Sequence, residues 1–323
     1  MIAVALPIYT DPSYLSFSSP FGRALHFSVV ELVVLAGFAL TVRHAVARYR
    51  AGDRYHVFQW LVIFVYGIAM ELLAFNYFQN YEHARFTVQL YHGKLPLYVT
   101  AVYVVFHYTG LKSIERLRLS WAAEALLVGF AICMLDVPFD TLGVDAGWWR
   151  WSTTDANLGH RWLGVPVTSY YWYLLFGAIF AALCRAVRGR VERRPVAAYV
   201  VLAPLVAVSV IVLGVVAFLP FHGLVALGVP EGTIVAAHLA ACAALALGVR
   251  APLAEGAPPD VLAVTAGLHG AYLAVLAGLW SAGAVQAAPA KLAAIVSAAV
   301  TSAIVAFGAP LGRRIGRPAS AAS

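Results

Sequence analysis

The chain has 323 residues, of which 62% are hydrophobic and 11% charged, and its mean hydropathy is +0.81. Soluble globular chains of this length do not have such a composition, so we exclude a soluble protein and predict an all-α, polytopic membrane bundle. The formal net charge of +7 does not indicate a nucleic-acid partner, because Lys and Arg fall between apolar segments.

Nine apolar segments are long enough to be membrane-spanning helices, since crossing the hydrocarbon core takes about 20 helical residues. They lie at about 26–45, 57–76, 95–111, 121–136, 166–184, 196–219, 232–249, 260–283 and 291–311. Alternate loops and the C-terminal tail hold 16 of the 22 Lys and Arg residues. The positive-inside rule therefore predicts an N-terminus outside the cytoplasm and a cytoplasmic C-terminus.

A proline-containing stretch, APLAEGAPPD, follows the seventh segment. We predict that it divides a catalytic bundle of spans one to seven, residues 1–250, from residues 251–323. The second part would consist of the linker, two further membrane helices and a basic tail.

Two stretches of the chain share one layout. In each, an apolar segment reaches an acidic residue, a polar and aromatic loop follows, and a proline opens the next apolar segment. Glu71 and Pro96 hold these places in the first stretch, and Asp136 and Pro166 hold them in the second. Both loops are predicted to lie on the non-cytoplasmic side, so the two acids are the leading candidates for a common site.

Glu71 follows fourteen largely apolar residues and has no Lys or Arg within helical reach. An ionised carboxylate inside a membrane costs a few kcal/mol, and acids placed there are functional candidates by default. We predict that Glu71 is a catalytic general acid. The alternative is a carboxyl group that only bonds a neighbouring helix.

The sequence MLDVPFD places Asp140 four residues after Asp136. The two carboxyl groups would share a helix face, but Pro138 predicts a broken or re-entrant backbone between them. Two carboxyl groups brought close together can divide the acid and base roles. We predict that both are catalytic, with a capping role of Asp140 after the proline as the alternative.

Aromatic and amide side chains beside these acids are predicted to bind an apolar substrate and to stabilise a developing carbocation. An interfacial aromatic belt is the alternative for the tryptophans. The candidates are Asn76, Tyr77, Asn80, Tyr98, Trp148, Trp149, Trp151 and Trp172. His83 and His92 lack the spacing of a metal-binding box, so we expect interfacial hydrogen bonds there and no metal.

These motifs together resemble the carotenoid biosynthesis membrane proteins that include the bisanhydrobacterioruberin and carotenoid 1,2-hydratases. The resemblance covers about residues 60–185 and is carried by the Gly67-x-x-x-Glu71 motif, the Pro-Leu pair at 96–97, MLDVPFDTLGVDAGWWRW and GVPVTSYYW. It implies a carotenoid or terpenoid hydratase (a hydro-lyase) or a cyclase that protonates a C=C bond of a long isoprenoid. No organic cofactor is needed for this chemistry.

Two other functions stay open. The Asp136-x-x-x-Asp140 spacing, with Arg150 and Arg161, fits a prenyltransferase-like enzyme that binds an isoprenoid diphosphate with Mg²⁺. The duplicated layout fits a carrier for a lipid or pigment. We expect an apolar isoprenoid or lipid partner, and a prokaryotic cytoplasmic membrane with the site toward its non-cytoplasmic face.

Overall fold

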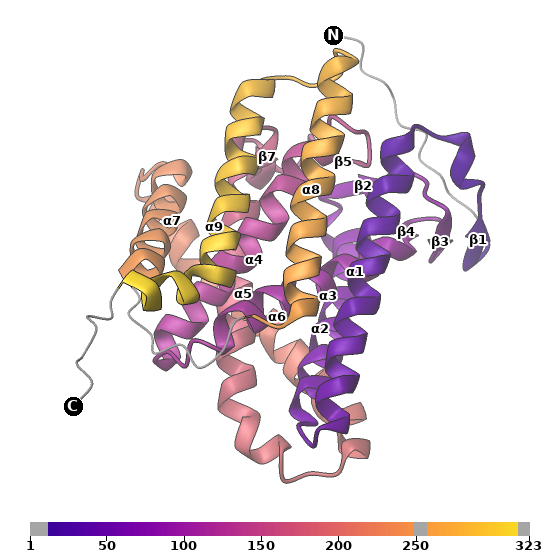
Figure 1. Ribbon diagram of the computed structural model, residues 1–323. Coiled ribbons are helices and arrows are strands. Elements are labelled where there is room, and N and C mark those ends of the chain that lie inside the picture. The colour runs from indigo at the N-terminus through magenta and orange to yellow at the C-terminus, as the bar shows by residue number, and fades with distance from the viewer. Residues whose placement is uncertain (1–11, 249–256, 316–323) are drawn as a thin grey trace.

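The computed structural model describes residues 12–248 and 257–315. They form a bundle of long α-helices with short strands gathered toward one end, in the upper half of Figure 1. The helices are α1 (Leu25–Arg50), α2 (Tyr55–Leu73), α3 (Leu97–Glu115), α4 (Trp121–Gly143), α5 (Val167–Val191), α6 (Tyr199–Ala226), α7 (Glu231–Gly248), α8 (Pro259–Ser281) and α9 (Ala288–Ile315). Every predicted apolar segment corresponds to one of them.

Eight of these helices are long and apolar enough to cross a membrane, as expected for an integral membrane protein. The exception is α3, which the sequence predicts as the third span. Nearly all of its residues are buried within the bundle, including His107 and Lys112. Because α3 is surrounded by protein, its polar side chains find partners in the bundle: Lys112 bonds Gln59 of α2, and His107 bonds the Tyr103 carbonyl oxygen of its own helix.

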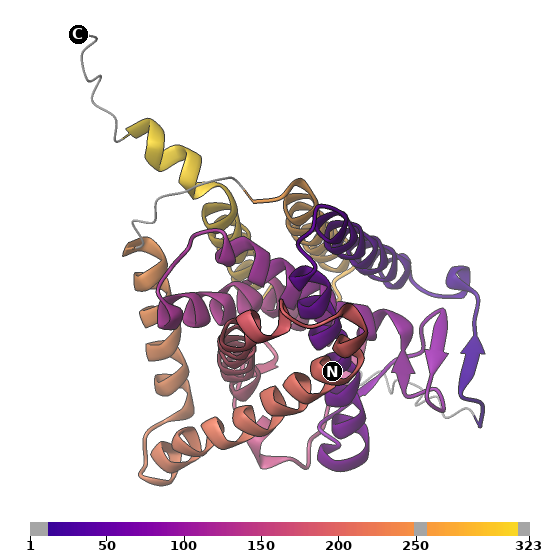
Figure 2. The same ribbon diagram turned by 90° about the horizontal axis from the view of Figure 1, so that it is seen from below.

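The helices differ in how deeply they are embedded. Helix α4 packs along α5 and also contacts α3, α7, α8 and α9, whereas α7 contacts few neighbours and stands at the edge of the bundle (Figures 1 and 2). Glycines set the close approach of α4 and α5. A Cβ at Gly129 would lie 2.1 Å from the Leu174 carbonyl oxygen, and one at Gly177 would lie 2.8 Å from the Gly129 Cα.

The two ends of the bundle differ in the segments that connect the helices. We call the end with the strands the loop end, and the end with the loops at 51–54, 116–120 and 192–198 the basic end. The short elements are β1 (Leu15–Phe17), β2 (Tyr81–His83), β3 (Val88–Leu90), β4 (Leu95–Pro96), β5 (Trp149–Trp151), β6 (Arg161–Trp162) and β7 (Val165–Pro166), with a π-helical turn η2 (Ala74–Phe78). Strands β1, β3 and β4 form one sheet, β2 pairs with β5, and β6 pairs with β7.

The last two helices pack against the rest of the bundle, α8 along α1 and α9 along α4. The Lys291 amine of α9 donates to the Thr141 carbonyl oxygen at 2.9 Å and lies 2.5 Å from the Asp145 carboxylate. Independence of the two predicted parts stays a prediction, since linker residues 251–256 and tail residues 316–323 lie outside the described residues.

Candidate active site

The two loops with repeated layout come together at the loop end. Strand β2 of the first loop pairs with β5 of the second in antiparallel register, with Tyr81 opposite Trp151. Each loop then enters a helix through a proline N-cap, Pro96 before α3 and Pro166 before α5. The α2–α3 and α4–α5 units therefore close over a common space.

Glu71 lies near the end of α2 and is 2% exposed. Its Oε1 accepts hydrogen bonds from the hydroxyls of Tyr81, at 2.8 Å, and Tyr103, at 2.9 Å. Its Oε2 lies 3.3 Å from His83 Nε2. Among the described residues no Lys or Arg forms an ion pair with Glu71. The partners of this carboxyl group are therefore two tyrosine hydroxyls and an imidazole.

A glycine allows the contact between Glu71 and Tyr103. A Cβ on Gly67 would lie 2.6 Å from the Tyr103 Cβ, closer than side chains tolerate. The bare backbone at Gly67 lets α3 approach α2, so the Tyr103 hydroxyl reaches a carboxyl one turn further along. The Gly-x-x-x-Glu motif thus has a steric cause.

Helix α4 runs from Trp121 to Gly143 through Pro138, so the predicted break at this proline is wrong. Proline removes one helical hydrogen bond, and membrane helices tolerate this where neighbours satisfy the freed groups. The Tyr272 hydroxyl of α8 donates to the Leu135 carbonyl oxygen at 3.0 Å, next to the Met134 carbonyl that Pro138 leaves without its helical donor. Because the helix continues, Asp136 and Asp140 lie on one face, one turn apart.

Both aspartates are buried, and Tyr173 of α5 holds the second one. The Tyr173 hydroxyl donates to Asp140 Oδ2 at 2.8 Å. Asp136 is 5% exposed and Asp140 is 4% exposed. As at Glu71, no Lys or Arg of the described residues forms an ion pair with either carboxyl group.

One cavity of about 400 Å³ joins the three acids. Glu71 faces it from α2, and Asp136 and Asp140 face it from α4. The rest of the wall is mainly apolar and aromatic, and includes Tyr66, Met70, Ala74, Phe78, Val99, Val102, Tyr103, Phe106, His107, Phe139, Leu158 and Tyr173. The arrangement can hold an apolar molecule against carboxyl groups contributed by two different helices.

Four of the predicted binding residues line this cavity: Asn80, Trp149, Trp151 and Trp172. Asn80 reaches it because the π-helical turn η2 and the left-handed Gln79 carry the chain from α2 toward the cavity. Trp149 fits because Gly143 is bare, as a Cβ there would lie 2.0 Å from the indole ring.

The other four predicted binding residues lie elsewhere. Trp148 is fully buried and donates to His26 Nδ1 at 3.2 Å, and Tyr98 packs on Phe86 with ring centroids 4.2 Å apart. Asn76 donates to its own helix, at the Leu72 carbonyl oxygen. Tyr77 is 77% exposed. We therefore remove Asn76, Tyr77, Tyr98 and Trp148 from the candidate site.

Sequence reasoning missed the direct partners of the acids. Tyr81, Tyr103 and Tyr173 bond Glu71 or Asp140, and His107 lines the cavity. His83 was expected to form an interfacial hydrogen bond, and its partner proves to be Glu71. The only signal in the sequence was the small residue Gly67, which marks where a side chain from another helix could approach.

The cavity wall includes exposed side chains on two sides. Val215 and Leu219 of α6, one helical turn apart, are 46% and 61% exposed. Phe78 of the π-helical turn is 47% exposed. Polar residues Asp155 and Asn157 from the β5–β6 loop also line the cavity. An apolar molecule can thus reach the acids past α6, and polar groups stand near the loop end.

The described residues offer few groups that could bind a diphosphate together with a metal ion. Within residues 12–248 and 257–315, no group of three or more His, Cys, Asp or Glu is placed to hold a metal ion. Arg150 bonds the Glu82 carboxylate at 2.7 Å, and Arg161 bonds the carbonyl oxygens of Leu158 and Ser152. Both guanidinium groups predicted for the diphosphate already have partners.

Comparison with known proteins gives one match. Residues 21–225, which include α1 to α6 and all three acids, match the model of a domain of unknown function, DUF7802. No curated protein and no solved structure matches the chain. Nothing in these comparisons links the chain to carotenoid biosynthesis. The family model spans more than half of the sequence and contains the whole cavity, and the chain therefore belongs to the DUF7802 family.

Proposed function

We propose that this protein is a membrane enzyme that protonates a C=C bond of a long, apolar isoprenoid, such as a carotenoid, and thereby hydrates or cyclises it. The observation that carries the proposal is the meeting of Glu71 with Asp136 and Asp140 in one aromatic-lined cavity, where no Lys or Arg of the described residues pairs with them. General acid–base chemistry needs a proton donor and a proton acceptor on either side of the reacting bond.

The proposed first step is proton transfer from the Glu71 carboxyl group to one alkene carbon. The O–H bond breaks as the new C–H bond forms, leaving a tertiary cation on the other carbon. The faces of Trp149, Trp151 and Trp172 line the cavity, and aromatic faces stabilise cations.

The second step determines the product. In hydration, a water oxygen bonds the cation while Asp136 or Asp140 takes the water proton. In cyclisation, an internal alkene captures the cation, and the same carboxylate removes a proton from the ring formed. The pairing of Asp140 with Tyr173, one turn from Asp136, supports a division of roles between the aspartates.

The surroundings of the cavity favour a lipid-soluble substrate. Exposed apolar side chains, Phe78, Val215 and Leu219, form part of the wall on helices of membrane-spanning length. A molecule dissolved in the bilayer could enter past them without crossing water. The clustering of Lys and Arg at the basic end supports a site that faces away from the cytoplasm.

A carrier for a lipid or pigment is the second candidate, favoured by the repetition of the α2–α3 and α4–α5 units around one cavity. A carrier would co-purify with unchanged ligand, and acid-to-amide variants would alter affinity and not conversion. A prenyltransferase would show magnesium dependence, but its predicted arginines are already engaged.

The test compares lipid extracts of cells that produce the protein with extracts of cells that do not, by mass spectrometry. A product heavier than its precursor by one water indicates hydration, and an isomer of equal mass indicates cyclisation. Glu71→Gln and Asp140→Asn should abolish the product, while the control Glu192→Gln at the basic end should leave it unchanged. Full conversion by both cavity variants would refute the assigned roles.

A further inference from the structure

A second, polar pocket adjoins the acid-lined cavity at the loop end. It occupies about 590 Å³, and its wall includes Lys94, Arg150, Ser152, Thr153 and Thr154. Three residues of the β2–β5 ribbon, Tyr81, His83 and Trp151, line both spaces. The ribbon is therefore a shared wall between a water-compatible pocket and an apolar cavity.

Besides Tyr81, His83 is the titratable side chain of this wall that contacts a cavity acid. Its Nε2 lies 3.3 Å from Glu71 Oε2, and its side chain is 7% exposed. Its Nδ1 is buried and has no hydrogen-bond partner among the described residues. The rings of Phe75, Tyr81 and Trp149 meet the imidazole nearly edge-on, with centroids 5.2 to 6.3 Å away, and hold its plane.

The two oxygens of Glu71 have different partners. Oε1 accepts from Tyr81 and Tyr103, hydroxyl groups that rarely give up a proton near neutral pH. Oε2 has His83 as its hydrogen-bond partner, and an imidazole can act as a proton shuttle because it has two ring nitrogens. The geometry makes His83 the route by which Glu71 can exchange a proton with the polar pocket.

We propose that His83 relays protons between the polar pocket and Glu71. In the starting state, neutral His83 donates its Nε2–H to the Glu71 carboxylate and presents a lone pair on Nδ1. A hydronium ion in the polar pocket gives a proton to Nδ1 and becomes water, the Nε2–H bond breaks, and its proton bonds Oε2. One proton enters, Glu71 becomes a neutral acid, and the imidazole stays neutral in its other tautomer.

This relay rests on the proposed function for its purpose, because hydration leaves Glu71 deprotonated and an aspartate protonated after each turnover. Glu71 must regain a proton before the next substrate molecule reacts. Charged groups of the shared wall do not compete for it, since Glu82 is paired with Arg150. Proton exchange through His83 can nevertheless be tested without any substrate.

The test measures hydrogen–deuterium exchange of Glu71 in purified, lipid-reconstituted protein without substrate. Infrared spectroscopy follows the C=O stretch of the protonated carboxyl group, assigned by its loss in Glu71→Gln. After a change to D₂O, the shift of this band should be slower by about tenfold or more in His83→Gln, a loss typical of a removed proton-transfer group. Gln can still donate to Oε2 but cannot relay.

Two controls separate relay from structure. His92→Gln changes a histidine in the same loop that contacts the Pro12 carbonyl oxygen, and it should leave exchange unchanged. Imidazole added to His83→Ala should restore fast exchange, because the polar pocket has room for it. Unchanged exchange in His83→Gln, no rescue by imidazole, or no Glu71-dependent band at any pH would overturn the relay. Absence of a lipid product with intact exchange would instead overturn only the proposed function.

Discussion

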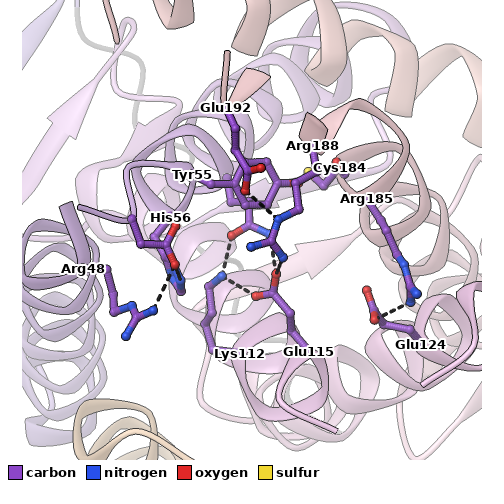
Figure 3. A network of polar contacts seen from close by, with 12 residues as sticks. Arg48, Tyr55, His56, Lys112, Glu115, Glu124, Cys184, Arg185, Arg188 and Glu192 are labelled. Carbon is purple, nitrogen blue, oxygen red and sulfur yellow. Dashed lines mark hydrogen bonds and ion pairs between the residues drawn. The ribbon is translucent and has the colours of Figure 1, made fainter. Parts of the chain in front are cut away.

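The two ends of the bundle bury acids in opposite ways. At the basic end, shown in Figure 3, the Lys112 amine of α3 bonds Gln59 and lies 2.6 Å from the Glu115 carboxylate. Arg188 reaches the same carboxylate at 3.7 Å and also pairs with Glu192. Each acid in this network has a Lys or Arg partner.

At the loop end, the cavity acids Glu71 and Asp140 bond hydroxyl groups and a histidine and no Lys or Arg of the described residues, whereas Asp145, outside the cavity wall, pairs with Lys291. Helix α2 contributes Gln59 to the network at one end and Glu71 to the cavity at the other. Helix α3 likewise contributes Lys112 to the network and Tyr103 to the cavity. Burial alone therefore does not distinguish Glu71, Asp136 and Asp140 from the other acids; the type of their partners and the cavity that they line do.

The largest expected effect is the loss of turnover on replacing Glu by Gln in the cavity, compared with the same replacement at the basic end. Glu71→Gln should lower turnover by about 10²- to 10⁴-fold with little change in thermal stability, because it removes a proton and keeps the hydrogen bonds. Glu115→Gln should leave turnover nearly intact and lower the melting temperature. Product analysis and melting in detergent check the pair. Equal losses of activity from both variants would refute the claim that Glu71 acts in turnover and Glu115 in stability.

Breaking the ion-pair network should destabilise the protein next most strongly. Lys112 is 3% exposed, so Lys112→Met removes a buried cation and leaves Glu115 with the longer contact to Arg188 and a hydrogen bond from Gln59. We expect a loss of about 3 kcal/mol in the free energy of unfolding. Reversible unfolding measures it, with Lys94→Met, at the rim of the polar pocket, as control. A change as small as the control would show that the network is not structural.

A smaller effect is expected where α3 approaches α2 beside the cavity. Gly67→Ala places a methyl group 2.6 Å from the Tyr103 Cβ and should cost about 1 to 3 kcal/mol. It should also lower turnover, because Tyr103 would move away from Glu71. Gly189→Ala is the matched control, since nothing lies within 4 Å of a Cβ there. Turnover and stability like those of wild type would show that this contact does not position the acid.

The smallest effect belongs to the exposed Arg188–Glu192 pair. The two side chains are 46% and 43% exposed and lie one helical turn apart at the end of α5. Glu192→Gln should change the free energy of unfolding by less than about 0.5 kcal/mol, and by less still at high salt. Urea titrations at two salt concentrations measure this. A larger loss would mean that Glu192 supports Arg188 in holding Glu115.

Sequence reasoning recovered the layout of the bundle because hydropathy is a property of consecutive residues. Every predicted span is a helix, and the two duplicated loops do meet, through the pairing of β2 with β5. It misplaced the break at Pro138, because a proline's effect depends on neighbours such as Tyr272, which is distant in the chain. It also missed the pairing of His83 with Glu71, although they are only 12 residues apart, because the pairing of β2 with β5 sets where His83 lies.

The sequence by itself determined that this protein is a bundle of apolar helices with an acid near the end of an apolar segment in each of two similarly laid-out units, because the cost of placing polar groups in hydrocarbon acts residue by residue. Only the tertiary structure decided that Glu71, Asp136 and Asp140 share one cavity and that tyrosines and His83, not cations, hold them. Those partners come from other helices and strands, and their choice depends on how closely the helices pack and which way each side chain points.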